Sequence, residues 1–252
     1  MAATGQPKMA VSTDELVICL IARLLENAGV VAVGSFSPIQ AAAALLAQQL
    51  YPGGTQALIF RNNINDPFHE SGSELYDRIG QGRIDVFFIS GGQIDGQANL
   101  NNVGVGEYPN TKVRFPGSFG TPFIHLMVPR VILYREEHTP RVLVKKVDFI
   151  SAAGMTPPGV HRRGGPTDLI TTKCAFTFDR VRGRFTLAST HPGFTASDII
   201  EATGFEFDIP SEVPQTPTPS AEWLRILHRV VRPQVAETYP QFAAARLGER
   251  AA

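Results

Sequence analysis

Short apolar runs alternate with amphipathic stretches along the first half of the chain, and glycine or proline separates most of them. The apolar runs are long enough for buried strands and too short for helices, and they lie at residues 30–33, 57–60, 86–89 and 131–134. The amphipathic stretches predict helices over residues 16–25, 39–50 and 73–79. Repeated strand and helix units predict an α/β fold with an open, largely parallel sheet flanked by helices.

The later part of the chain has a more irregular pattern. Beyond residue 134 it predicts a strand over 142–150, a hairpin made of 169–178 and 184–189, a helix from Thr195 to Gly204, a short strand over 205–209 and a last helix over 220–231. Residues 103–123 and 154–168 show little periodicity, and long loops inside a compact domain are usually functional. At the other end of the chain, Ser12 and Glu15 have the spacing of a capping box before the first helix.

The chain shows no internal repeat and no second set of core segments. We therefore expect a flexible N-terminus over residues 1–11, a single domain over 12–235 and a C-terminal tail over 236–252. The first residues lack the apolar run of a signal peptide, and no apolar run reaches membrane-spanning length. These features predict a cytoplasmic protein that does not enter a membrane.

Charge and cysteine content narrow the class of partner. The 23 Lys and Arg residues balance 23 Asp and Glu residues, so the sequence lacks the basic excess of a general nucleic-acid binder or a membrane-surface protein. Cys19 and Cys174 have the spacing of neither a metal site nor a redox pair, and no two of the six histidines are spaced as in a helical metal site. We expect no metal, no permanently bound cofactor, and a small molecule or another protein as the partner.

Candidate chemistry gathers where the apolar run at 86–89 ends. Gly91 and Gly92 follow it, and six hydrogen-bonding side chains come next: Gln93, Asp95, Gln97, Asn99, Asn101 and Asn102. In open α/β sheets, ligands bind at the carboxyl ends of the strands, where glycine lets the backbone come close. The alternative is a polar turn that caps its own backbone. For Asp95 we expect this ordering role rather than that of a general base.

Four stretches, taken in order, resemble the β subunit of the class I coenzyme A transferases, of the glutaconate CoA-transferase type. They are G-G-Q-I-D-G-Q-A-N-L-N at 91–101, K-V-R-F-P-G-S-F-G at 112–120, V-K-K-V-D-F-I-S at 144–151 and H-P-G-F-T at 191–195. The resemblance implies an open α/β fold of the CoA-transferase/NagB-like type and an α subunit, usually in an α2β2 assembly. It also implies that a β-subunit glutamate attacks the acyl-CoA thioester, and that CoA converts the resulting anhydride to a glutamyl-CoA thioester.

The sequence departs from this family at the expected glutamate. The resemblance places that residue directly after the strand at 57–60, where this chain has Arg61-Asn62-Asn63. A guanidinium has no oxygen with which to form an anhydride. Glu70 precedes Ser-Gly as the family glutamate does and is the outside candidate, although it also fits an exposed carboxylate near a helix start. Phe119 and Phe123 replace a glycine and an acid of the family's glycine-rich loop.

After these departures, the sequence supports two reactions almost equally. CoA transfer between carboxylic acids is the nominal activity of the proposed β subunit. The alternative is acyl-CoA hydrolysis or ring-opening C–C hydrolysis with an α-subunit glutamate, because the steroid-ring hydrolase of bacterial cholesterol degradation is similar in lacking the β-subunit glutamate. A non-catalytic, pocket-forming subunit and a sugar-phosphate isomerase of related fold are the remaining hypotheses.

No catalytic residue of this chain is assigned, because Arg61 occupies the glutamate position. The candidates for binding the substrate or its CoA moiety are Arg61, Asn62, Gly91, Gly92, Gln93, Asn99, Gly117, Ser118 and Gly120. The cations Lys112, Arg114, Arg162 and Arg163 are candidates for contact with CoA phosphates or the α subunit, with plain solvation as the alternative.

Overall fold

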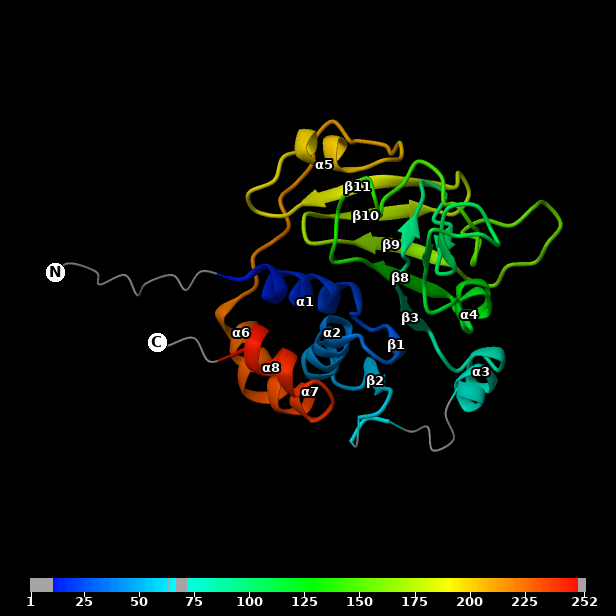
Figure 1. The fold of residues 1–252 in the computed structure, drawn as a ribbon. Helices are drawn as coiled ribbons and strands as arrows, with labels where there is room; N and C mark the ends of the chain where they lie inside the picture. Colours follow the sequence, from blue (N-terminus) through cyan, green and yellow to red (C-terminus); the bar gives the residue numbers. More distant parts are fainter. Residues whose placement is uncertain (1–10, 63, 67–71, 249–252) are drawn as a thin grey trace.

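A seven-stranded sheet forms the centre of the molecule (Figure 1). The computed structural model describes residues 11–62, 64–66 and 72–248. In the spatial order β11-β10-β9-β8-β3-β1-β2, the strands are β11 (Arg184–Thr190), β10 (Cys174–Asp179), β9 (Pro166–Ile170), β8 (Arg130–Tyr134), β3 (Val86–Ile89), β1 (Gly29–Val33) and β2 (Thr55–Ile59). Neighbours from β9 to β2 run parallel, and β10 runs antiparallel to β9 and β11. The predicted α/β fold with an open, largely parallel sheet is confirmed.

Helices cover both faces of this sheet (Figure 1). One face carries α1 (Thr13–Leu24), α2 (Pro38–Leu50), α6 (Ala221–Ile226), the π-helical turn η1 (Leu227–Val231), α7 (Arg232–Thr238) and α8 (Pro240–Arg246). The other face carries α3 (Gly72–Gly80), α4 (Thr121–Met127) and α5 (Ala196–Ala202). Strand side chains alternate between the two layers, since Val31 and Val33 pack in the first core and Ala32 in the second.

Two small hairpins lie between β3 and α4. They pair β4 (Gln93–Ile94) with β5 (Leu100–Asn101) and β6 (Gly104–Val105) with β7 (Val113–Arg114). The aperiodic stretch 103–123 therefore contains the second hairpin and the start of α4, which the periodicity of the sequence did not indicate. Two helix starts have complete capping boxes, the predicted one at Ser12 and Glu15 and another at Thr195 and Asp198.

Three predicted strands were wrong in whole or in part. Residues 142–150 form no strand, because β9 occupies the place beside β8 and the β-pairing at Leu143 is limited to an isolated bridge with Ile94 of β4. The predicted strand 169–178 divides into β9 and β10, because the Thr171 side chain accepts from the backbone N–H groups of Lys173 and Cys174 and closes a tight turn. Residues 205–209 contribute one bridge, between Asp208 and Thr186 of β11.

The C-terminal helices belong to the packed structure. The predicted boundary at residue 235 falls inside α7, and Ala243 and Leu247 of the supposed tail are buried in the core that α1 and α2 form. Arg246 also binds the carboxylate of Asp14 at the start of α1. Among the described helices, none has the length and apolar character needed to cross a bilayer.

Candidate functional site

The carboxyl ends of β1, β2 and β3 meet at one edge of the sheet. The register places Val33 opposite Ile59, and the backbone N–H of Phe60 donates to the carbonyl oxygen of Val33 at 3.1 Å. β3 lies on the other side of β1, so the ends of β2 and β3 are about 10 Å apart. The sequence candidates at residues 61–62 and 91–92 are therefore neighbours along this edge.

Three exposed side chains near this edge sit on left-handed backbone. Phe36 follows β1, Arg61 follows β2 and Phe119 precedes α4, with φ angles of +60°, +62° and +48°. Such angles are uncommon outside glycine and concentrate at functional sites. Phe36 and Phe119 are each 86% exposed, which is far more than a phenylalanine in a core position. The sequence contains no pattern that predicts a left-handed backbone at Phe36 or at Phe119.

Arg61 lies in a closed turn. Its backbone N–H donates to Oδ2 of Asp66 at 2.6 Å, and the backbone N–H of Ile59 donates to the carbonyl oxygen of Asn65 at 2.8 Å. The Arg61 side chain is exposed, so its planar guanidinium is available to an anion such as a carboxylate or a phosphate. Asn63 and Glu70 lie outside the described residues, and the outside candidate at Glu70 stays untested.

Asn62 is buried beneath this turn, with 1% of its surface exposed. Its side-chain oxygen accepts from the backbone N–H groups of Ile64 and Asn65 at 3.2 and 2.9 Å. Its side-chain nitrogen donates to the Gln234 carbonyl oxygen at 3.1 Å and to the Thr238 hydroxyl at 3.2 Å, both on α7. With these partners, Asn62 shapes the turn from below.

Packing rather than ligand approach explains the glycine at position 92. A Cβ atom at Gly92 would lie 2.3 Å from the ring of Phe115, and one at Gly91 would lie 2.7 Å from the carbonyl oxygen of Gln93. Asn102 connects the two loops, because its side chain accepts from the Gly92 N–H at 3.1 Å and its carbonyl oxygen accepts from the Gly117 N–H at 3.1 Å. The structure thus brings the 91–92 and 115–117 stretches together.

The polar side chains after Gly92 form a buried network. Asp95 accepts from the backbone N–H groups of Gln97 and Asn99 at 3.0 and 3.1 Å, which confirms its expected ordering role. Asn99 donates its side-chain N–H to Asp95 and accepts from the Gly154 N–H at 3.0 Å. Both partners of the Asn99 side chain are groups of this chain rather than of a ligand. Asn99 therefore joins the loop at Asp95 to the loop at Gly154.

Gln93 is held in the same way. Its side-chain oxygen accepts from Asn101 at 2.7 Å and from the backbone N–H of Asp148 at 3.0 Å. The Asp148 carboxylate accepts in turn from the Gln93 side chain at 3.2 Å and from the Gly106 N–H at 2.8 Å. Sequence reasoning missed Asp148, because it lies in the segment predicted as a strand. The signal was present as the carboxylate inside the V-K-K-V-D-F-I-S stretch.

The third loop carries Gly117, Ser118 and Gly120. Gly117 has a φ of +113°, and nothing lies within 4 Å of the place where its Cβ would be, so its outer side is open. A Cβ at Gly120 would instead meet the phenolic oxygen of Tyr76 on α3. The rings of Tyr76 and Phe119 are 6.2 Å apart. Burial raises the pKa of the Tyr76 phenol, so this aromatic contact carries no charge near neutral pH.

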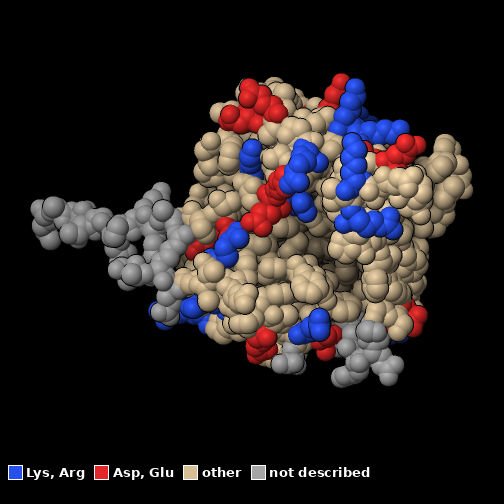
Figure 2. Space-filling view, viewed as in Figure 1, with Lys and Arg blue, Asp and Glu red and all other residues tan. Residues whose placement is uncertain are grey.

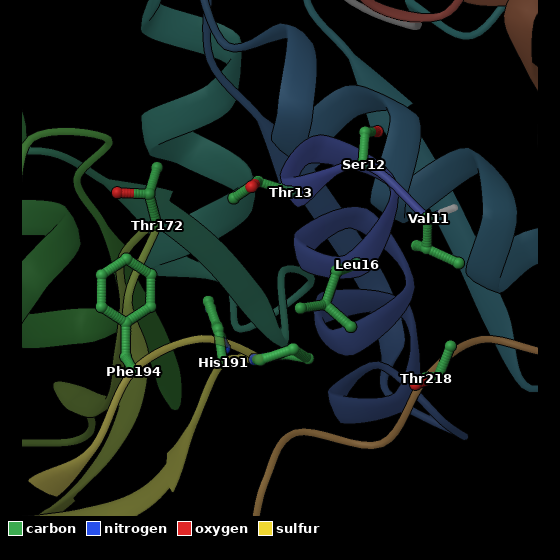
Figure 3. A pocket seen from close by; sticks show the side chains of 9 residues that line it. Val11, Ser12, Thr13, Leu16, Thr172, His191, Phe194 and Thr218 are labelled. Carbon is green, nitrogen blue, oxygen red and sulfur yellow. The ribbon is translucent and has the colours of Figure 1, made fainter.

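Within the part of the chain that the structure describes, one hollow lies beside β2 and another near the opposite end of the strand order. The one beside β2 measures about 320 Å³, close to the smallest ligand sites, and its lining includes Gln48, Gln56 and Asp66. The other measures about 90 Å³ and holds only small molecules (Figure 3). Its labelled side chains come from α1 and the two residues before it, the turn after β9, the segment between β11 and α5, and the stretch before α6. They include His191, which is buried with both ring nitrogens hydrogen-bonded.

Charged side chains are mixed on the face shown in Figure 2, where Asp and Glu lie among Lys and Arg. Lys112 and Arg114 are exposed. Arg162 is not, since its guanidinium donates to the carbonyl oxygens of Gly164, Ala153 and His125. Cys19 and Cys174 are buried free thiols, and the described residues contain no cluster of His, Cys, Asp and Glu suited to a metal ion.

The chain matches the family model described as coenzyme A transferase over residues 51–202. It is 29% identical to the β subunit of the 3-oxoadipate CoA-transferase of Pseudomonas knackmussii, over 92% of this chain and 97% of that protein. Its fold matches the glutaconate coenzyme A-transferase of Acidaminococcus fermentans with a TM-score of 0.77 at 22% identity, covering 90% of this chain and 97% of that one.

A second solved structure, IpdAB of Rhodococcus jostii RHA1, matches with a TM-score of 0.77 at 21% identity and covers 91% of this chain and 98% of the other. At such identities the structural likeness supports the fold alone. The family match is more specific, since its residues 51–202 run from the last turn before β2 through the loops at 91–92 and 117–120 to α5. Because this match spans more than half of the sequence, the chain belongs to the coenzyme A transferase family.

Proposed function

We propose that this chain is the β subunit of a heteromeric enzyme that acts on an acyl-CoA thioester, nominally by moving CoA between two carboxylic acids. One observation carries the proposal. The segment that matches the family, residues 51–202, contains the turn at Arg61, the Gly91–Gly92 loop and the Gly117–Gly120 loop, which together form most of the candidate edge.

Within this site we assign anion binding to Arg61. Its side chain is exposed at the carboxyl end of a parallel strand, and a guanidinium binds carboxylates and phosphates through two parallel hydrogen bonds. Gly117 and Ser118 are the proposed contacts for the CoA moiety, because the space over Gly117 is open. Gly91, Gly92, Gln93, Asn99 and Gly120 contribute by fixing the loops, and CoA enters as part of the substrate.

The acyl-accepting carboxylate comes from elsewhere than position 61. Glu70 is the outside candidate within this chain, and a glutamate of the α subunit is the other source. A carboxylate there acts on the thioester carbonyl as a nucleophile or on water as a general base. A second candidate function is acyl-CoA hydrolysis or ring-opening hydrolysis with an α-subunit glutamate. The replacement of the family glutamate by Arg61 favours it over CoA transfer. A third candidate function is that of a non-catalytic subunit that forms part of the pocket.

The proposal includes an α subunit, in an α2β2 assembly, and a cytoplasmic role in the breakdown of carboxylic acids. Phe36 and Phe119 support a partner at this edge, because large apolar side chains that stand in water are typical of interaction surfaces. The proposed partners include neither nucleic acid nor membrane lipid, since the net charge of the chain is zero.

Product analysis of the reconstituted complex tests the proposal. The complex is incubated with an acyl-CoA and an isotope-labelled acceptor acid, with each subunit alone as a control, and thioesters and free thiol are quantified. CoA transfer gives a labelled acyl-CoA while total thioester stays constant. Free CoA without labelled thioester identifies an acyl-CoA hydrolase, whereas an unlabelled thioester whose acyl group has gained one water identifies ring-opening C–C hydrolysis. If the α subunit alone shows the full activity of the complex, this chain is not a functional subunit of the enzyme.

A further inference from the structure

The junction of α7 and α8 touches both turns that present the exposed residues of the candidate site. Thr238 ends α7 and Tyr239 links it to α8, more than 170 positions after the β2 turn in the sequence. Val235 of α7 is buried in the core, so the junction has a fixed base against the sheet. It is therefore placed to hold the ends of β1 and β2 in a set relation to each other.

Thr238 serves the β2 turn. Its hydroxyl donates to the carbonyl oxygen of Arg61 at 3.4 Å and accepts from the side-chain nitrogen of Asn62 at 3.2 Å. The Gln234 carbonyl oxygen, one turn earlier on α7, accepts from the same Asn62 nitrogen at 3.1 Å. These three contacts fix the backbone of the residue whose left-handed conformation turns its side chain outward.

Tyr239 serves the turn after β1. Its phenolic oxygen accepts from the backbone N–H of Ser37 at 3.3 Å, directly after Phe36 in the chain. Ser37 is the residue before α2, so this phenol secures the entry into that helix as well as the left-handed Phe36. Strained backbone persists only where surrounding structure determines it, and here one helix junction does so at both turns.

We propose that Thr238 and Tyr239 are positioning residues of the acyl-CoA site, which act by locking the Phe36 and Arg61 turns at the carboxyl edge of the sheet. The expected effect on KM rests on the proposed function. The expected effect on the two turns rests on the hydrogen bonds alone. It assigns to the end of the chain, outside the segment that matches the family, a part in substrate binding.

Kinetics of the reconstituted complex provide the first test. Thr238→Val removes the hydroxyl and keeps the shape, and we expect KM for the acyl-CoA to rise about tenfold, since a 1 Å misplacement in a site costs up to roughly a hundredfold. Thr238→Ser, which retains the hydroxyl, restores KM, and Tyr239→Phe acts in the same direction as Thr238→Val. In an Arg61→Ala background we expect Thr238→Val to have no further effect on KM. The reason is that Thr238 affects substrate binding only by positioning the Arg61 side chain, which that background lacks.

The matched control is Thr55→Val at the other end of β2. The Thr55 hydroxyl donates to the Leu25 carbonyl oxygen at 2.7 Å, so its loss lowers stability without reaching the candidate edge. Equal kinetic effects of Thr238→Val and Thr55→Val would overturn the inference, as would full additivity with Arg61→Ala. If Thr238→Val does not fold, Tyr239→Phe replaces it in the comparison with Thr55→Val, since the Tyr239 hydroxyl holds the other turn.

Amide hydrogen exchange tests the inference without any substrate. In Thr238→Val we expect faster exchange in peptides that cover residues 59–66, and in Tyr239→Phe faster exchange at 34–37, with no such change in Thr55→Val. Unchanged exchange at both turns would contradict the inference. A complex that turns over no acyl-CoA disproves the proposed function, while the exchange data still decide whether the junction holds the two turns.

Discussion

Arg61 shows how far a single position can be interpreted from the sequence. Its place after an apolar strand predicted a residue at the carboxyl edge, and the register of β2 with β1 puts it there. Its left-handed backbone was not predictable, because that conformation depends on Asp66 and on α7 contacts distant in the sequence. Asn62 looked like a turn-former or a ligand contact, and its burial followed only from the packing of α7.

Buried histidines give the molecule a pH dependence at the residue scale. His138 is 2% exposed, and its ring nitrogens bond to the hydroxyl groups of Thr171 and Thr203 at 2.8 and 2.9 Å. Burial, with smaller effects of Lys173 and His191, lowers its pKa from 6.5 to about 4. The folded protein therefore keeps this imidazole neutral at a pH where the unfolded chain takes up a proton.

The free energy of unfolding is expected to be insensitive to this group above pH 6.5 and to fall as the pH drops from 6.5 toward 4. The slope per histidine is at most about 1.4 kcal/mol per pH unit. Urea unfolding at several pH values measures it, and His138→Gln should show a shallower slope than the wild type. Identical slopes for the two proteins would mean that His138 protonates equally in the folded and unfolded states.

At the scale of elements, the loop after β3 depends on close packing between Gly92 and Phe115. The backbone at Gly92 is not left-handed, so space rather than conformation requires the glycine. We predict that Gly92→Ala lowers the free energy of unfolding by about 1–3 kcal/mol, as overpacking does. Adding Phe115→Leu should recover much of this loss.

Gly117→Ala is the control, since its cost comes from a φ of +113° with no neighbour within 4 Å. Phe115→Leu should give no recovery there. Urea denaturation of the wild type, the two single variants and the two double variants measures all these effects. Failure of Phe115→Leu to recover stability in the Gly92→Ala protein, beyond its effect in the Gly117→Ala protein, would contradict the packing explanation.

Short apolar runs predicted the parallel strands correctly because each run is buried on both faces and depends little on its partner. The errors arose where hydrogen bonds decide the outcome. Residues 142–150 had a strand-like pattern, yet β9 occupies the place beside β8, and Val142 and Val144 bond to Ile94 instead. The polar network of Gln93, Asn99 and Asp148 likewise depends on contacts between residues far apart in the chain.

At the scale of the whole molecule, the C-terminal helices complete one of the two cores. The sequence predicted a last helix over 220–231 and a tail over 236–252, yet Leu247 is 1% exposed. We predict that Leu247→Ala costs about 2–5 kcal/mol of unfolding free energy, the range for a leucine truncated in a core. Gln241→Ala, an exposed change in α8, the helix that Leu247 follows, should cost about 0.5 kcal/mol or less. Equal costs measured by urea unfolding would show that α8 is not packed.

The assembled enzyme depends, in this account, on an anion contact made by this chain at the end of β2. The kinetics of Arg61→Ala in the reconstituted complex, beside Arg141→Ala, test this most directly, because Arg141 is an exposed arginine whose charge is already paired with Glu137. A hydrogen bond to a charged group contributes about 1.5–3 kcal/mol. Arg61→Ala should therefore lower kcat/KM for the acyl-CoA by about tenfold or more, while Arg141→Ala leaves it unchanged. Equal kinetic constants for the two variants would contradict the account and make this edge of the chain a scaffold.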